Sequence, residues 1–523
     1  MEYEQVCRKL AEEISSGTIR TREQLDQRKA ELSKEYHLPK LISNPDILSV
    51  SQDKRVISLV QRKPTRTISG VAVIAVMTRP HPCPHGRCLY CPGGVHTPQS
   101  YTGKEPAAMR AIQHAYDPYA QVQARLAQLH AIGHPTDKCE LVLMGGTFPS
   151  EDIDYQEYVV KRCFDAFNEK DALDVEDALR YNESAENRVI GLTMETRPDW
   201  CRKEHIDRML QVGATRVELG VQTVYDSVYE LVERGHTVED VVMATEWLKD
   251  AGLKVGYHMM PGLPGSDFDK DIQAFRTLFE DSRFRPDMLK VYPCQVLEDT
   301  KLYDWYTSGR YTPYSEEDMV ELLVEIKKML PEYVRIMRIG RDIPSFLIKA
   351  GIKKTNIGQI AERRLKEKGF TCKCIRCREV GRNMLRGIEP DPDCIDIVHT
   401  EYEASHGREV FIQAKDIKND LLIAFLRLRI PGNSWREEIG ETAAVVRELR
   451  VYGPLVPLGE APQEKWQHRG FGEDLLREAE RLSLTHKKDR LLVLSGVGVK
   501  PYYEQLGYHR IGPYMGVDLD ELG

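Results

Sequence analysis

The sequence predicts an α/β protein in which a partial TIM-type (β/α)6 barrel precedes a smaller C-terminal α+β domain. Two observations lead to this fold class. Between residues 71 and 294, six short apolar runs alternate with longer amphipathic segments, which is typical of parallel strands joined by helices. After Asp391, four strand-like segments follow one another closely, at 394–404, 409–416, 421–430 and 443–453. Their spacing indicates an antiparallel meander.

The six expected barrel strands lie at residues 71–78, 140–148, 189–198, 216–223, 254–265 and 288–294. The intervening segments, such as 107–133 and 238–252, have helical periodicity and end at glycine, as helices often do. In barrels of this kind, catalytic side chains gather at the C-terminal ends of the strands. The polar residues that directly follow the expected strands are therefore the first candidates for a site.

The composition is that of a globular protein with a large core. Of 523 residues, 41% are hydrophobic and 29% are charged, and the formal net charge is −8. This net charge gives no general support for nucleic-acid binding, so a basic surface must be local. Residues 1–17 predict an amphipathic helix rather than a signal peptide, and no segment approaches the ~20 apolar residues of a membrane span. We therefore expect a cytoplasmic protein with no membrane partner.

Six of the 12 cysteines fall in two tight clusters. Cys83, Cys88 and Cys91 form C-x4-C-x2-C directly after the first expected strand. Three thiolates can hold three irons of a cubane [4Fe–4S] cluster and leave the fourth iron free for a small-molecule ligand. A structural zinc site, completed by one of three nearby histidines (His81, His85 or His96), is the alternative that the spacing alone leaves open.

The segment around these cysteines, CPHGRCLYCPGG, resembles the radical S-adenosylmethionine (SAM) superfamily, with one residue more than the usual C-x3-C-x2-C. The extra residue resembles one branch, the catalytic subunit of Elongator (the Elongator protein three family). Further segments, CREVG, WQHRGFG and GVGVKPYYEQLGY, extend this resemblance over nearly the whole chain. It implies a [4Fe–4S] cluster held by Cys83, Cys88 and Cys91, and SAM. The residues it implies near SAM or the substrate are Gly145, Gly146, Thr147, Glu195, Thr196, Arg197 and Gln222. Lys290, at the end of the sixth expected strand, is expected to be a catalytic residue that makes a polar contact to the substrate.

A second signature lies near the C-terminus. Residues 467–472 fit Q-x-x-G-x-G at the start of an expected helix, where free backbone N–H groups can bind a pyrophosphate. With the strand at 491–498 and the helix that carries Tyr502 and Tyr503, this resembles the GNAT acetyltransferase fold. The resemblance implies that acetyl-CoA is bound by Gln467, His468, Arg469, Gly470, Phe471, Gly472, Tyr502 and Tyr503. The tyrosine pair is also expected to be catalytic, because the family uses it to handle the acetyl group. No motif marks a general base, and Glu441, Glu448 and Glu504 are alternatives.

Cys372, Cys374 and Cys377 form the second cluster, C-x-C-x2-C. This spacing resembles part of a structural zinc site, for which Cys294, Cys394 or His399 could supply a fourth ligand; thiols without metal are the alternative. The cluster lies in a strongly basic segment. Between Arg335 and Arg386, 15 Lys and Arg stand against four Asp and Glu. Together with a basic stretch at 54–66, this segment could follow the phosphate backbone of a folded RNA.

These patterns divide the chain into four expected regions. They are a helical, basic N-terminal region (1–70) that contacts tRNA, a radical SAM domain (71–345), a basic linker with the zinc site (346–390) and a GNAT domain that binds acetyl-CoA (391–523). The implied reaction modifies the wobble uridine in the tRNA anticodon. A SAM-derived radical takes hydrogen from the acetyl group, the carbon radical adds to carbon five of uracil, and thioester hydrolysis leaves a carboxymethyl group. Expected partners are the anticodon stem-loop, an electron donor and, for assembly, a second copy or other Elongator-like subunits.

Two other functions remain as alternatives. One is a protein lysine acetyltransferase with a structural iron–sulfur module, which would acetylate a peptide without SAM. The other is a non-catalytic RNA-binding scaffold, which would bind tRNA without cleaving SAM or acetyl-CoA. The presence of two cofactor signatures in one chain disfavours both.

Overall fold

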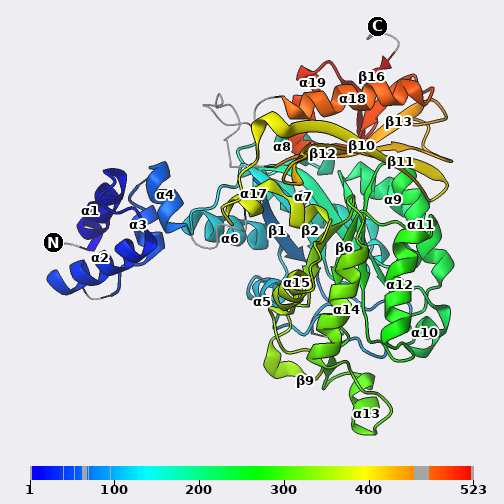
Figure 1. The fold of residues 1–523 in the computed structure, drawn as a ribbon, viewed down its shortest axis with the longest axis horizontal. Coiled ribbons are helices and arrows are strands. Elements are labelled where there is room, and N and C mark those ends of the chain that lie inside the picture. The colour runs from blue at the N-terminus through cyan, green and yellow to red at the C-terminus, as the bar shows by residue number, and fades with distance from the viewer. Residues whose placement is uncertain are drawn as a thin grey trace.

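The computed structural model describes residues 3–38, 40–51, 53–61, 67–68, 70–94, 96–452 and 470–519. At the N-terminus, four helices form a small unit: α1 (Tyr3–Ser15), α2 (Arg22–Glu35), α3 (Asn44–Leu48) and α4 (Lys54–Val60). Their apolar faces pack on one another around a core of their own, which includes Leu10, Leu32 and Val56. In Figure 1 this unit stands to one side of the rest of the molecule.

The central element is a half-barrel of parallel strands. Its strand order is β1-β2-β3-β4-β5-β6-β8, and every neighbouring pair is parallel. The strands are β1 (Ala72–Met77), β2 (Lys138–Met144), β3 (Arg188–Thr196), β4 (Arg216–Gln222), β5 (Lys254–Met259), β6 (Met288–Val291) and β8 (Arg335–Ile339). The six predicted strands overlap β1 to β6, so the predicted α/β fold class is confirmed.

The described sheet nevertheless has one strand more than the predicted six, because β8 pairs with β6. β8 carries an arginine at each end of the sequence RIMR, so it does not stand out as an apolar run. The Arg335 guanidinium is accommodated because it donates to the Tyr452 hydroxyl at 2.7 Å and to Glu379 at 2.9 Å. A strand with a charged residue at its start can therefore belong to a parallel sheet when a partner lies at that end.

Helices connect the strands and bury their apolar faces against the sheet in one continuous core. They include α6 (Pro118–Ala131), α7 (Ile153–Asn168), α9 (Lys203–Gln211), α11 (Val238–Asp250), α12 (Phe268–Glu280) and α14 (Glu316–Met329). The segment predicted as a linker also packs into this core through α15 (Ile357–Glu367), α16 (Ile375–Arg378) and α17 (Val380–Met384). Within the described part of the chain, none of the helices combines the length and apolarity needed to cross a membrane.

The C-terminal domain is built on a second sheet, of order β10-β11-β12-β13-β14-β16-β15. Its strands are β10 (Ile395–Ala404), β11 (Gly407–Asp416), β12 (Leu421–Ile430), β13 (Ala443–Val451), β14 (Arg490–Val493), β15 (His509–Ile511) and β16 (Tyr514–Asp518). β10 to β13 form the predicted antiparallel meander. The helices α18 (Phe471–Thr485) and α19 (Lys500–Gln505) lie on the outer side of this sheet (Figure 1).

Two central strands of this sheet separate part of the way along. β13 and β14 are parallel and paired from Ala443 and Arg490 to Val446 and Val493. β14 ends there, whereas β13 continues to Val451. One edge of the last part of β13 therefore has no strand beside it among the described residues. A separation of this kind opens a sheet to an extended ligand.

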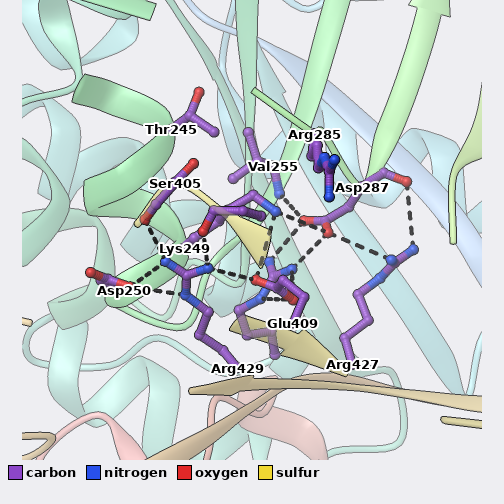
Figure 2. Close-up of polar contacts among 12 residues, drawn as sticks. Thr245, Lys249, Asp250, Val255, Arg285, Asp287, Ser405, Glu409, Arg427 and Arg429 are labelled. Carbon is purple, nitrogen blue, oxygen red and sulfur yellow. Dashed lines mark hydrogen bonds and ion pairs between the residues drawn. The ribbon is translucent and has the colours of Figure 1, made fainter. Parts of the chain in front are cut away.

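The C-terminal sheet is joined to the N-terminal ends of the barrel strands by buried ions (Figure 2). Arg447 of β13 binds both oxygens of Asp287, which directly precedes β6, at 2.8 and 2.7 Å. Arg429 of β12 binds Asp250, the last residue of α11, at 2.6 Å. Further ion pairs make this a network of four cations and four anions: Lys249, Arg427, Arg429, Arg447, Asp250, Asp287, Glu409 and Glu448.

Candidate active site

The first cysteine cluster lies where the sequence predicts, after β1 and at the C-terminal ends of the barrel strands. Cys83, Cys88 and Cys91 line one end of a cavity of about 410 Å³. The cavity extends along the inside of the half-barrel and reaches Glu140 of β2 and Arg216, the first residue of β4. Cys88 and Cys91 are buried. Burial raises the pKa of the Cys91 thiol to about 12, so an apolar surrounding alone does not favour its thiolate.

The arrangement of the three sulfurs fits a polynuclear cluster better than a single ion. A tetrahedral zinc site with Zn–S bonds of about 2.3 Å brings its sulfurs to about 3.8 Å from one another. Among the described residues, two groups of His, Cys, Asp or Glu place three ligand atoms within 4.8 Å of one another, and this loop is not one of them. Three separated thiols at the mouth of a cavity can instead hold three irons of a [4Fe–4S] cluster and leave one iron facing the cavity.

Residues around the loop hold it in shape. Gln99 accepts a hydrogen bond from the Cys83 amide at 2.9 Å and donates to the Gly86 carbonyl at 3.1 Å. The His85 ring lies with Nε2 at 3.2 Å from Cys88 Sγ. Burial beside Arg197 and Arg234 lowers the pKa of His85 to about 3, so the ring is neutral near pH 7.

The predicted SAM residues surround the same cavity. Gly146 and Thr147 line it directly, and the Thr147 hydroxyl lies 3.5 Å from Cys83 Sγ. Gly145 lies behind them, against Thr78. Glu195, at the end of β3, also lines the cavity and accepts a hydrogen bond from the Tyr101 hydroxyl at 2.8 Å.

Gln222, the last residue of β4, has two unusual properties. Its φ is +74°, in the left-handed region that a residue with a side chain rarely adopts. Its Oε1 atom is buried and has no hydrogen-bond partner, although the side chain lines the cavity. Local strain and an unsatisfied polar atom together are typical of residues held ready for a ligand. The free Oε1 atom of Gln222 could accept a hydrogen bond from a polar group of SAM.

Lys290, at the end of β6, lies between two carboxylates. Its Nζ is 3.2 Å from Glu195 Oε1 and contacts Glu218 of β4 directly. Glu218 also binds His258 Nε2 at 2.8 Å. Burial disfavours the charge of Glu218, but Lys290, His258 and Arg216 outweigh it and hold the pKa of this carboxyl well below its usual range. Glu195, Glu218 and His258 could hold a metal ion by distance, but the Lys290 ammonium already contacts both carboxylates.

Several residues of this cavity were not predicted. Tyr101, Glu218, Arg234 and His258 all line it, and His85 was considered only as a zinc ligand. Apart from polar residues at their ends, the strands RVELGVQ and KVGYHM each carry one acidic or basic side chain that interrupts an apolar pattern, Glu218 and His258. An inward-facing polar residue in a buried strand is a signal that could have identified them. Arg234 and Tyr101 lie in loops, where nothing in the sequence distinguishes them.

The second candidate site is at the separation of β13 and β14. α18 begins at Phe471, and its N-cap Gly470 has φ +79° and provides no side-chain cap. The free amides at this end can bind an anion. A Cβ placed on Gly472 would lie 3.1 Å from the Tyr502 hydroxyl and 3.8 Å from Val451. Because Gly472 has no side chain, there is room beside Tyr502, next to the part of β13 that has no paired strand on this edge among the described residues.

The two predicted tyrosines differ in position. Tyr502 is 37% exposed and faces the start of α18, whereas Tyr503 is 5% exposed and belongs to the domain core. Their rings pack edge to face, with centroids 5.2 Å apart. The geometry therefore makes Tyr502, rather than Tyr503, accessible to a ligand. Gln467, His468 and Arg469 of the predicted motif lie outside the described residues.

None of the three alternatives for a general base is placed to act as one near neutral pH. Glu448 accepts a hydrogen bond from Arg427 at 2.8 Å. Burial disfavours its charge, yet Arg427 and Lys254 outweigh burial and hold the pKa of Glu448 below its usual range. Glu504 is paired with Arg510 at 3.0 Å, and Glu441 is exposed.

The three thiols of the second cysteine cluster lie close together. The sulfurs of Cys372, Cys374 and Cys377 all lie within 4.8 Å of one another, and hydrogen bonds from the other two thiols hold the pKa of Cys374 well below its usual range. This donor set fits three sides of a tetrahedral zinc site. The predicted fourth ligands lie elsewhere: Cys294 packs with Cys88 and Cys91, Cys394 lies beside Asp391, and His399 faces Glu478. Lys327 Nζ lies 3.8 Å from Cys377 Sγ.

Most of the basic segment is neutralised within the protein. Ten of its 15 Lys and Arg form ion pairs, many of them with acidic residues outside the segment, such as Glu317 and Glu321 of α14. Lys353, Arg363 and Lys373 are exposed and have no ion pair among the described residues. The positive surface available to an RNA is thus smaller than the composition indicates. Arg62, Lys63 and Arg66 of the N-terminal basic stretch lie outside the described residues.

Three known domain families together match most of the chain. The ELP3 N-terminal domain matches residues 3–68, the Radical SAM superfamily residues 80–278 and the Radical_SAM C-terminal domain residues 286–367. The chain is 48% identical over 530 residues to the tRNA uridine(34) acetyltransferase of Methanocaldococcus jannaschii, covering 98% of this chain and 97% of that protein. It is 41% identical over 524 residues to Elongator complex protein 3 of Saccharomyces cerevisiae, covering 97% and 94%.

A solved structure agrees with these matches. The archaeal Methanocaldococcus infernus Elp3 with an N-terminal deletion (1–46) has a TM-score of 0.78 and 45% identity to this chain. The similarity covers 86% of this chain and 100% of that structure.

Proposed function

Because the chain belongs to the Elongator protein 3 family, we propose that it modifies the wobble uridine of tRNA, the base that the names of its archaeal relatives specify. The proposed product carries a carboxymethyl group on carbon five of that uridine. The reaction uses SAM as radical source and acetyl-CoA as carbon source. The anticodon stem-loop is the proposed RNA partner, and the cytoplasm is the proposed location.

One observation carries this proposal. A single cavity brings together three cysteine thiols, the turn at Gly146 and Thr147, and the strained, unpartnered Gln222. These residues fit a [4Fe–4S] cluster bound by Cys83, Cys88 and Cys91 and a SAM molecule beside it. When bound, the cluster supplies the single electron that cleaves SAM and yields a 5′-deoxyadenosyl radical.

The chain's own residues position the reactants. Gln222 offers its free carbonyl oxygen to SAM, and Tyr101 orients the Glu195 carboxylate. Lys290 neutralises Glu195 and Glu218. These two carboxylates hold its ammonium group in the cavity, where it can donate hydrogen bonds to the oxygen atoms of the uracil. The buried walls exclude water, which would otherwise quench a carbon radical.

The proposed reaction conserves atoms and electrons. A hydrogen atom passes from the acetyl methyl group to the 5′ carbon of the SAM-derived radical, and the methyl carbon then bonds to carbon five of the uracil. The C5 proton and one electron leave, and the electron returns to the one-electron couple that supplied it. Water attacks the thioester, which releases coenzyme A and leaves the carboxylate.

We propose that acetyl-CoA binds where β13 and β14 separate. The free amides at the start of α18 suit its pyrophosphate, and Tyr502 donates to the thioester carbonyl. The C-terminal sheet lies at the N-terminal ends of the barrel strands, and the cavity extends from the cysteine loop toward that end, to Glu140 and Arg216. This favours the barrel interior as the place where the acetyl methyl group and the radical meet.

Further partners and metals complete the proposal. Cys372, Cys374 and Cys377 hold a structural zinc ion, with the fourth ligand supplied by water or by a group outside the described residues. The exposed Lys353, Arg363 and Lys373 and the N-terminal helical unit contact tRNA phosphates. An external electron donor reduces the cluster, and a second copy or Elongator-like subunits complete the assembly.

A lysine acetyltransferase is disfavoured on physical grounds. Such an enzyme needs a base that can accept a proton from the amine near neutral pH. Glu448 and Glu504 are already bound to arginines, and Glu441 is exposed.

The experiment is an anaerobic reaction with SAM, a reductant, methyl-labelled acetyl-CoA and bulk tRNA, followed by mass spectrometry of the nucleosides. The proposal predicts label in a carboxymethylated uridine, lost in Cys88→Ser and retained in the control Cys394→Ser. Labelled acetyl-lysine that persists in Cys88→Ser, with no labelled nucleoside, would contradict it.

A further inference from the structure

Cys88 differs from the other two cysteines of its loop in the groups around its sulfur. His85 Nε2 lies 3.2 Å and Arg234 Nη1 3.6 Å from Cys88 Sγ. Cys83 Sγ has one hydroxyl nearby, that of Thr147 at 3.5 Å. Cys91 Sγ contacts the Pro92 carbonyl at 3.5 Å, which cannot donate. Among the described residues, nitrogen donors therefore converge on one of the three sulfurs.

The contact between His85 and Arg197 determines which ring nitrogen carries the proton. Arg197 Nη1 lies 2.6 Å from His85 Nδ1. A guanidinium has donors and no acceptor, so Nδ1 must accept this hydrogen bond. The proton of the neutral ring is therefore on Nε2, and the contact with Cys88 is an N–H···S hydrogen bond.

The position of the His85 ring is held from both sides. Arg197 is itself fixed by two 2.9 Å bonds to the Asp199 carboxylate and by a 2.8 Å bond to the Arg234 carbonyl. On the other side lies Gly235, with φ +74°, where an added Cβ would come within 2.8 Å of His85 Cβ. A chain of contacts from Asp199 through Arg197 and His85 thus ends at the sulfur of Cys88.

We propose that His85, held in the Nε2–H form by Arg197, raises the reduction potential of the iron–sulfur cluster by donating to the Cys88 thiolate. This inference rests on the proposed function, because it requires the cluster. A thiolate ligand carries more negative charge after one-electron reduction, so a donor stabilises the reduced state more than the oxidised state. His85 lies within the four residues between Cys83 and Cys88, so the loop that carries the cysteines also carries the donor.

The test compares potentials rather than turnover. Wild type, His85→Met, His85→Gln and the control His81→Met are reconstituted anaerobically, and each midpoint potential is measured by a dithionite titration followed by EPR. Met removes the donor at similar size, whereas Gln keeps an N–H group near the position of Nε2. His81 faces Glu151 at 3.4 Å. We expect reduction of His85→Met to be about tenfold less favourable, about 59 mV for a one-electron couple, with most of this recovered in His85→Gln and no change in His81→Met.

Equal potentials in wild type and His85→Met, or equal shifts in His85→Met and His85→Gln, overturn the inference. If His85→Met does not retain iron, wild type labelled with 15N-histidine decides the question by pulsed EPR of the reduced cluster. Hyperfine coupling from one imidazole nitrogen supports the hydrogen bond, and no coupling from histidine refutes it. A wild type that assembles no four-iron cluster would overturn the proposed function and this inference together. Equal potentials in a wild type and a His85→Met variant that both hold the cluster would overturn this inference alone.

Discussion

Arg447 and Asp287 form a fully buried ion pair with two hydrogen bonds across the junction of the half-barrel and the C-terminal sheet. The guanidinium nitrogens lie 2.8 and 2.7 Å from the two carboxylate oxygens, and both side chains are 0% exposed. The same guanidinium binds Glu409 at 2.7 Å. Two modules whose contacting residues are 160 positions apart in the sequence are therefore joined by matched charges, and the relative placement of the two candidate sites depends on them.

Removing one member of this pair should destabilise the junction strongly. In Asp287→Asn, Arg447, Lys249 and Arg427 lose their shared counter-charge inside the protein, which we expect to cost about 3–5 kcal/mol of unfolding free energy. The control is Glu478→Gln, which breaks a pair with the exposed Arg481 and should cost at most about 1 kcal/mol. Urea unfolding of the C-terminal sheet, followed by fluorescence, measures both. A loss in Asp287→Asn no larger than in Glu478→Gln would show that the network does not hold the domains together.

Lys290→Met should abolish most SAM cleavage without unfolding the barrel. It leaves the Glu195 and Glu218 carboxylates without their shared cation beside the cavity, and loss of one preorganised charge of this kind costs about 10²–10³-fold in rate. The measurement is 5′-deoxyadenosine formation at constant iron content. Lys301→Met, which removes an exposed pair with Glu233, is the matched control. Equal rates of 5′-deoxyadenosine formation in both variants would show that Lys290 has no part in SAM cleavage.

Gly472→Ala tests the proposed position of the thioester. The added Cβ would lie 3.1 Å from the Tyr502 hydroxyl, close enough to displace it by a few tenths of an ångström, while helix propensity favours Ala by about 1 kcal/mol. We expect unchanged or higher stability and a roughly tenfold slower tRNA-dependent hydrolysis of acetyl-CoA, about 1.4 kcal/mol. In a Tyr502→Phe background the same change should have no further effect on the rate. Additive losses in the double variant would mean that the two residues act separately.

The second cysteine cluster predicts one zinc ion per chain in addition to the iron. Cys374→Ala should lose the zinc, lower the thermal midpoint and keep the iron, because Cys374 is buried at the start of α16 and far from the first loop in the sequence. Elemental analysis of the purified protein measures both metals, with Cys394→Ala as control. Zinc retained in Cys374→Ala, or absent from the wild type, would refute a site at these cysteines.

The sequence allowed the barrel and the cysteine loop to be predicted because both depend on local pattern. Apolar runs mark β1 to β6, and the thiols of the first loop lie within nine residues of one another. β8 was missed because Arg335 and Arg338 interrupt its apolar pattern, and the partners of Arg335, Glu379 and Tyr452, come from distant segments. Glu218 and His258 can be recognised in the sequence as polar residues within buried strands, but only the curvature of the sheet brings them into one cavity.

The junction between the modules could not be predicted. Arg427 and Arg429 alternate with apolar residues in β12, and Arg447 begins a charged stretch of β13, patterns that normally indicate a solvent-exposed face. Here that face is buried because a second surface of opposite charge, from Asp250 and Asp287, covers it. Complementarity between surfaces that are far apart in the sequence has no local signal. The free positive charge of the segment from Arg335 to Arg386 was overestimated for the same reason, since many of its counter-charges lie outside the segment.

The central claim is that one chain uses a SAM-derived radical to activate the methyl group of acetyl-CoA for transfer to tRNA. The most direct test is a reaction with acetyl-CoA carrying a trideuterated methyl group, with and without tRNA, in which 5′-deoxyadenosine is analysed by mass spectrometry. The account predicts one deuterium in 5′-deoxyadenosine, formed together with carboxymethylated uridine and absent in Cys88→Ser. Unlabelled 5′-deoxyadenosine beside a modified uridine would show that the acetyl methyl group is not the hydrogen donor, and would contradict the account.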